Sequence, residues 1–323
     1  MKKYFLILLI TLSTVSPMLF AQKTILSLTT DFAYHPASEL IADGSGGSHF
    51  APITGPYSGL EACTTFNAAF RFNTPLGEHW LLSDANIMLG TSLELTPISL
   101  RPKLSLEFAL LPFLIFNSGA SFGWGWNFPG IKGLCEYNKE SGEFENLSTF
   151  KHPYYDFWAG VRLQFDTGAL FEGDWTHVIM LASFTSLYSG IVGLEEKSIY
   201  EWQCGKFRAK GWLYEIQGIL GYQMPLVLRR IGIMVKSVAY YDGSVYGEFD
   251  ETFDGDFATV NISPFLQFDF GEKDELSCLF DFSSRRSYNN KIENDRDILI
   301  QKASGREWFF NRIALSWTHK FKQ

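Results

Sequence analysis

Residues Ser83 to Leu110 read SDANIMLGTSLELTPISLRPKLSLEFAL, and apolar side chains alternate with polar ones on both sides of Thr96-Pro97. An alternation of period two is that of a β-strand, whose successive side chains point to opposite faces. The stretch therefore predicts two strands folded back on each other around a loop at Thr96-Pro97. The expected partners on the apolar face are Leu95 with Ile98, Leu93 with Leu100, Leu89 with Leu104 and Ile87 with Leu106.

The length of these two strands separates them from the strands of ordinary soluble domains. Each runs for about thirteen residues, whereas roughly five or six is usual. One face is continuously apolar and the other carries charges such as Glu94, Arg101 and Glu107. Strands of this kind suit a wall between lipid and water.

Composition agrees with one large β domain. Of 323 residues, 16% are aromatic and only 19% are charged, below the roughly 25% of soluble domains. Beyond the N-terminus, no stretch approaches the roughly 18 apolar residues of a membrane helix, so a polytopic helical protein is excluded.

The N-terminus predicts export. Lys2 and Lys3 precede an apolar run from Tyr4 to Leu12, and the small residue Ala21 follows. This pattern is that of a secretory signal peptide over residues 1–21, with the mature barrel over 22–323; an uncleaved anchor fits less well because the apolar core is short. Without Lys2 and Lys3 the chain has 25 basic against 35 acidic residues, so nucleic acid is excluded as a partner.

The same alternation recurs along the chain and predicts an all-β fold, a closed antiparallel transmembrane β-barrel of about twelve strands. An open sheet edge in lipid would leave backbone groups unsatisfied, so the barrel must close. Short connections, at 73–79, 110–112, 224–230 and 271–275, would be periplasmic, and the longer ones extracellular. The faces of the strand within 176–189 are left unassigned because both are apolar. Inward glycines in SGASFGWGW predict room for bulky neighbours.

The alternation sorts side chains into two sets. Residues expected to face the lumen mix both charge signs and are Arg71, Asp84, Glu94, Arg101, Lys103, Glu107, Asp156, Arg162, Glu215, Lys236, Asp269 and Asp281. Residues expected to face lipid are Leu89, Leu93, Leu104, Leu106, Trp124, Trp212, Phe268 and Trp317. Five tryptophans could serve as carbohydrate platforms, but most of them are interpreted as girdles at the membrane interfaces; they are Trp124, Trp126, Trp158, Trp212 and Trp317.

With its exported N-terminus and a last strand that alternates Ile313, Leu315, Trp317 and Phe321, the chain resembles bacterial outer-membrane β-barrel proteins. The resemblance implies residence in the lipid bilayer of the outer membrane and recognition by the barrel-assembly machinery through the C-terminal strand. Here Phe321 is followed by Lys322 and Gln323, a departure from the family's aromatic C-terminus. The LELTPISL and SGASFGWGW stretches look like those of treponeme-type spirochaete barrels, which would make the source Gram-negative in envelope.

Three functions are weighed against one another. A narrow porin-like pore for small hydrophilic solutes, with a mixed-charge lumen, is the first. A filled barrel that acts as a surface-binding, adhesin-like or structural protein is the alternative. An outer-membrane hydrolase is third: the His-x-Ser and Asp-x-His pairs of outer-membrane enzymes occur at none of the six histidines, so we expect no catalytic residue, although a triad can assemble from distant strands.

No cofactor or metal is expected. The acidic segment EFDETFDGD could gather oxygens for Ca²⁺ but lacks the spacing of a calcium loop, and a solvated charge run is the simpler interpretation. Of the four cysteines, only Cys135 and Cys204 are plausible disulfide partners, both being in expected loops; free thiols are the other possibility.

Overall fold

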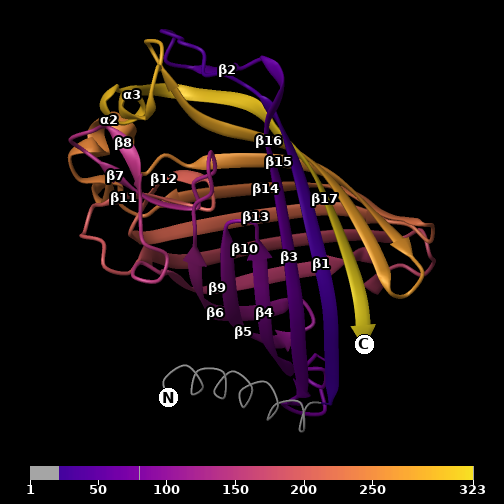
Figure 1. Ribbon diagram of the computed structural model, residues 1–323. Helices are drawn as coiled ribbons and strands as arrows, with labels where there is room; N and C mark the ends of the chain where they lie inside the picture. Colours follow the sequence, from indigo (N-terminus) through magenta and orange to yellow (C-terminus); the bar gives the residue numbers. More distant parts are fainter. Residues whose placement is uncertain (1–21, 80, 323) are drawn as a thin grey trace, which may run out of the picture.

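The computed structural model describes residues 22–79 and 81–322, without the side chain of Lys322. Its main feature is a barrel of twelve antiparallel strands, in which the first strand pairs with both the second and the last (Figure 1). The strands are β1 (Lys23–Ala37), β3 (Gly55–Asn73), β4 (Asn86–Thr96), β5 (Ser99–Leu111), β6 (Leu114–Gly125), β9 (Tyr154–Asp166), β10 (His177–Ile191), β13 (Gly211–Gln223), β14 (Leu228–Tyr240), β15 (Thr259–Phe270), β16 (Asp274–Tyr288) and β17 (Ala303–Lys322). The predicted closed twelve-strand barrel is confirmed. The predicted signal peptide, residues 1–21, lies outside the described residues.

The hairpin of β4 and β5 forms, but its predicted register is wrong by two residues. Thr96 pairs with Ser99, Leu95 with Leu100 and Leu89 with Leu106, so the turn is Pro97-Ile98. The hydroxyls of Thr96 and Ser99 lie 2.7 Å apart and close this turn, and Ile98 is buried instead of joining the apolar face. A shift of two leaves every side chain on its expected face, because the period of a strand is two.

The strand whose faces the sequence left open is β10. Met180 and Phe184 are exposed on one face, at 40% and 42% of their surface, while Ser183 and Thr185 on the other face line a cavity. The barrel strand β13 begins at Gly211, and the residues just before it belong to a separate short strand that ends at Ala209.

The two ends of the barrel differ. One end has connections such as 112–113, 224–227 and 271–273, whereas the connections at the other end, apart from the two-residue turn at 97–98, carry their own secondary structure. These additional elements are β2 (Ser48–Phe50), β7 (Leu134–Asn138), β8 (Glu143–Asn146), β11 (Ile199–Trp202), β12 (Gly205–Ala209), η2 (Gly243–Phe249), α2 (Asp250–Phe253) and α3 (Asp295–Ile300). Among the described residues, no helix is both long and apolar enough to cross a membrane.

The connection from Asn127 to Pro153 contains the two short strands β7 and β8. These strands join β11 and β12 in a separate four-stranded sheet. We call this sheet, together with η2, α2 and α3, the cap (Figure 1). Its core is aromatic, with Tyr137, Phe144, Tyr246, Phe249 and Phe253 packed together. Burial of these side chains holds loops from four different connections in one body.

Candidate functional site in the barrel interior

The two faces of the barrel wall differ in chemistry. On one face Glu94 and Asp156 expose only 8% of their surface and Asp281 only 2%, whereas Leu104 on the opposite face exposes 61%. Buried charges persist only when they are paired or hydrogen-bonded. The candidate site is therefore the charged face, and its pairing pattern decides what it can do.

One network lies near the long-connection end of β4, β5 and β9. Arg101 and Lys103 approach the Glu94 carboxylate at 2.9 and 2.6 Å. Arg101 also lies 3.6 Å from Asp156, which accepts a 2.6 Å hydrogen bond from Ser121. Four of the predicted inward charges thus meet in one cross-strand cluster.

Further ion pairs continue along the same part of the wall. Arg162 on β9 donates to Glu107 on β5 at 3.1 Å, across the intervening strand β6. Lys236 on β14 lies 2.6 Å from Glu215 on β13. The charges alternate in sign, so this surface has little net charge despite being strongly polar.

A separate network surrounds Asp281 on β16. Its carboxylate accepts hydrogen bonds from Asn261, Ser263 and Asn311 at 2.8 to 3.3 Å. Arg312 lies 3.6 Å away and also pairs with Glu61 at 3.0 Å. Asp281 is therefore held by polar groups from the two neighbouring strands, β15 and β17.

The remaining predicted inward residues lie outside these networks. Asp84 is exposed in the connection before β4 and belongs to no strand, because β4 begins only at Asn86. Asp269 lies near the short-connection end with Arg229 at 3.8 Å. Arg71 has no ion pair among the described residues, and its Nε is buried without a hydrogen-bond partner there.

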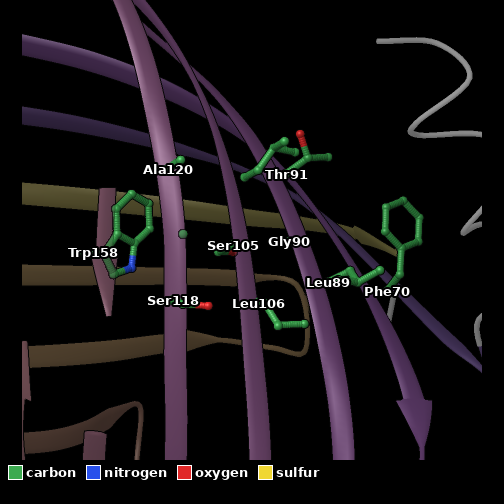
Figure 2. Close-up of a pocket in the computed structure, with 11 residues that line it drawn as sticks. Phe70, Leu89, Gly90, Thr91, Ser105, Leu106, Ser118, Ala120 and Trp158 are labelled. Carbon is green, nitrogen blue, oxygen red and sulfur yellow. The ribbon is translucent and has the colours of Figure 1, made fainter. Parts of the chain in front are cut away.

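The predicted lipid-facing residues are mostly exposed. Leu89, Leu93, Leu104, Leu106, Trp212 and Trp317 expose 36 to 61% of their surface, and Trp124 and Phe268 are half-buried. Phe70, Leu89 and Leu106 border a shallow apolar groove of about 450 Å³ whose floor is formed by small residues such as Ser118 and Ala120 (Figure 2). Such a band of exposed apolar side chains is unusual for a protein surrounded by water.

Trp158 does not lie at a membrane interface, and its interpretation as a girdle residue is corrected. Trp158 lies beside the strand that carries Ser118 and Ala120 (Figure 2), and a Cβ at its strand partner Gly119 would collide with its ring. The ring borders two interior cavities of about 330 and 270 Å³, which also share Asn117, Thr185 and Glu215. The predicted space beside the glycines of β6 is confirmed, since it accommodates this ring.

The cap reaches the inner wall through the turn between β11 and β12. Trp202 is fully buried, stacks on Tyr154 at 4.6 Å between ring centres and covers Gly123 and Gly125. The next residue, Gln203, donates to Glu94 at 2.9 Å and to Ser99 at 2.8 Å. The cap is therefore attached to the charged network, and it narrows this end of the barrel.

Sequence reasoning missed a second attachment. Glu307 on β17 is fully buried and binds Arg285 at 2.6 Å, His49 at 2.9 Å and the backbone NH of Ile41 at 2.9 Å. These contacts fix the connection that carries β2 against β16 and β17. Glu307 shares the parity of the outward-facing Ile313, Leu315 and Trp317, so strict alternation would place it outward. It is buried inward because the register between β16 and β17 shifts by one residue at Asn311, and nothing in the sequence indicates this shift or the partner in a distant loop.

The structure also bears on the acidic segment and on the four cysteines. The segment forms η2 and α2 of the cap, where Arg286 lies over the Phe253 ring at 3.6 Å and donates to the Asp254 carbonyl. The segment is therefore packed through Phe249 and Phe253, while Glu248, Glu251, Asp254 and Asp256 are exposed, as expected for a solvated charge run. All four cysteines are free thiols, with Cys135 buried and Cys204 exposed. In the described part of the chain, no three His, Cys, Asp or Glu side chains are grouped to hold a metal.

Comparison with known proteins finds solved structures of similar overall fold. No family model matches the chain, and no curated protein sequence matches it. A solved outer-membrane channel from Pseudomonas putida F1 is 9% identical with a TM-score of 0.44, over 94% of this chain and 98% of that one.

Two further structures are similar at the same level. The β domain of the Bordetella autotransporter BrkA is 7% identical with a TM-score of 0.42, over 93% of this chain and 100% of that chain. The outer-membrane channel DcaP of Acinetobacter baumannii is 9% identical with a TM-score of 0.38, over 92% and 96%. All three are bacterial outer-membrane barrels, and at such low similarity they carry no argument about what this chain binds or transports.

Proposed function

We propose that the chain is an outer-membrane barrel that forms a narrow channel for small hydrophilic solutes. The observation that carries this proposal is the pair of adjoining cavities inside the closed barrel, of about 330 and 270 Å³, bordered by Arg101, Asp156, Glu107, Arg162 and Glu215. A barrel filled like a protein core would have no such polar space between its walls.

The exposed leucines and tryptophans of the opposite face support the membrane location. In this proposal they contact lipid, and the charged networks line the lumen. The predicted signal peptide over 1–21 and mature barrel over 22–323 are part of the same proposal, as is recognition of the C-terminal strand by the assembly machinery. The spirochaete resemblance stays a prediction.

A second candidate function has its own support. The cap covers part of the long-connection end, and Trp202 and Gln203 attach it to the wall. A surface-binding module would place such a folded body outside the cell. In that case the barrel would be an anchor and solutes would not cross it.

Swelling of vesicles that contain the refolded protein separates the two functions. We expect vesicles to swell in small sugars such as arabinose and to swell progressively less in larger sugars, as a narrow pore requires. Protein that resists unfolding in unheated SDS gels, and is therefore folded, but gives no swelling in any solute would favour the anchored module. An enzyme activity is not needed for either outcome.

A further inference from the structure

Trp158 is an aromatic side chain on the polar side of the wall. On that side a contact with lipid does not explain the presence of an aromatic residue. It is only half-buried, although Gly119 leaves a place for its ring. Both interior cavities touch it, together with Asn117, Thr185 and Glu215. A large apolar surface thus meets hydrogen-bonding groups in the two cavities, while it also borders the apolar groove beside Gly119.

Two donors beside this ring have no partner. The Nε atoms of Arg101 and Arg162 are buried and make no hydrogen bond within the described part of the chain. Arg101 borders the larger of the two cavities and Arg162 the smaller. Both guanidinium groups already have acidic partners, and their buried Nε atoms are out of reach of a ligand in the cavities, so hydrogen bonds to a ligand come from the other polar groups that line the cavities.

The charges around the ring cancel. The ion pairs closest to the ring join four acids, Glu94, Glu107, Asp156 and Glu215, to four bases, Arg101, Lys103, Arg162 and Lys236. Every one is in an ion pair, so a ligand with a net charge would have to disrupt a pair to be favoured. A neutral ligand with many hydroxyl groups can accept and donate hydrogen bonds without doing so.

From these observations we propose that Trp158 is the platform of a binding site for a neutral carbohydrate within the lumen. The apolar C–H face of a sugar ring packs on the indole, and the hydroxyls bond to Asn117, Thr185 and Glu215, which border both cavities. Each cavity is near the lower end, roughly 300 Å³, of known small-ligand sites. The inference rests on the proposed function, because it places the site on the path of solutes.

Saturation-transfer NMR on the folded protein in detergent tests the site without requiring transport. The probes are maltotriose, sorbitol, which has hydroxyls but no ring, and glucuronate, which has a ring and a charge. We expect saturation of the ring protons of maltotriose and little or none for the other two. Equal signals from all three probes, or none from maltotriose, would overturn the proposal.

Variants of Trp158 test whether maltotriose binds at this residue. Trp158→Ala should weaken maltotriose binding at least tenfold, and Trp158→Phe should weaken it severalfold while keeping the protein folded. Trp212→Ala removes a tryptophan from the opposite face, where 46% of its surface is exposed, and should bind as the unchanged protein does. Full binding by folded Trp158→Phe and Trp158→Ala would contradict the site.

The test of the carbohydrate site gives an answer that is independent of the test of the channel. Maltotriose binding without vesicle swelling would overturn the channel and leave the carbohydrate site standing. Swelling without maltotriose binding would overturn only the site.

Discussion

Placing an arginine on the outer face of β5 tests which side of the wall contacts lipid. Leu104 exposes 61% of its surface and lies near the middle of β5, between Thr91 of β4 and Ala120 of β6. At the middle of a bilayer, an arginine on the lipid face costs about 2 to 4 kcal/mol. Leu104→Arg should therefore lower the ratio of folded to unfolded protein by roughly thirty- to several-hundred-fold.

The matched control introduces the same side chain on the other face. Thr185 borders both interior cavities and pairs with Glu215 across the strands, so the guanidinium of Thr185→Arg has both space and an acidic neighbour. The folded fraction of both variants is measured by gel mobility during urea titration in lipid vesicles. Stable Leu104→Arg together with unstable Thr185→Arg would show that the two faces are assigned the wrong way round.

Three other predictions concern the cap and its attachments. Gln203→Ala removes both hydrogen bonds to the wall, so the current through single channels should rise; an unchanged current would show that the cap does not restrict the path. Glu307→Ala leaves the partners of a buried carboxylate unpaired and should lower the free energy of unfolding by about 3 kcal/mol, which an unchanged urea midpoint would refute. Burial, with the nearby Glu201, raises the pKa of Cys135 to about 11. Because the thiolate is the reactive form, folded protein at pH 8 should be alkylated at exposed Cys204 and not at Cys135, with Cys135 reacting only as the pH approaches 11; equal alkylation, located by mass spectrometry, would contradict its burial.

The barrel itself was predictable because lipid and water impose a strict alternation. Ile87 to Leu95, apart from Met88 and Thr91, and Leu100 to Phe108 show it, and the strand count follows from repeating the same test. The register was less predictable, since two pairings that differ by two residues place the same side chains on the same faces. The hydrogen bond between the side chains of Thr96 and Ser99 selects one of the two pairings. No pattern in the sequence predicts that hydrogen bond.

The cap was not predictable for a different reason. Its strands β7, β8, β11 and β12 are four or five residues long, too short to show an alternation. They are stabilised by contacts between loops far apart in the chain, such as that of Tyr137 with Phe249. The inward position of Trp158 could have been found, because it follows from the parity of Asp156 and Arg162, but tryptophan in a membrane barrel was assigned to the interface on residue type alone.

Recording current across a planar lipid bilayer tests the central claim most directly. With purified, refolded protein on one side, we expect discrete steps of small, uniform conductance that increase in the Gln203→Ala variant and show only weak preference between cations and anions, because the charges of the lumen wall are paired. A silent bilayer, obtained with protein that gel mobility shows to be folded and inserted, would contradict the channel.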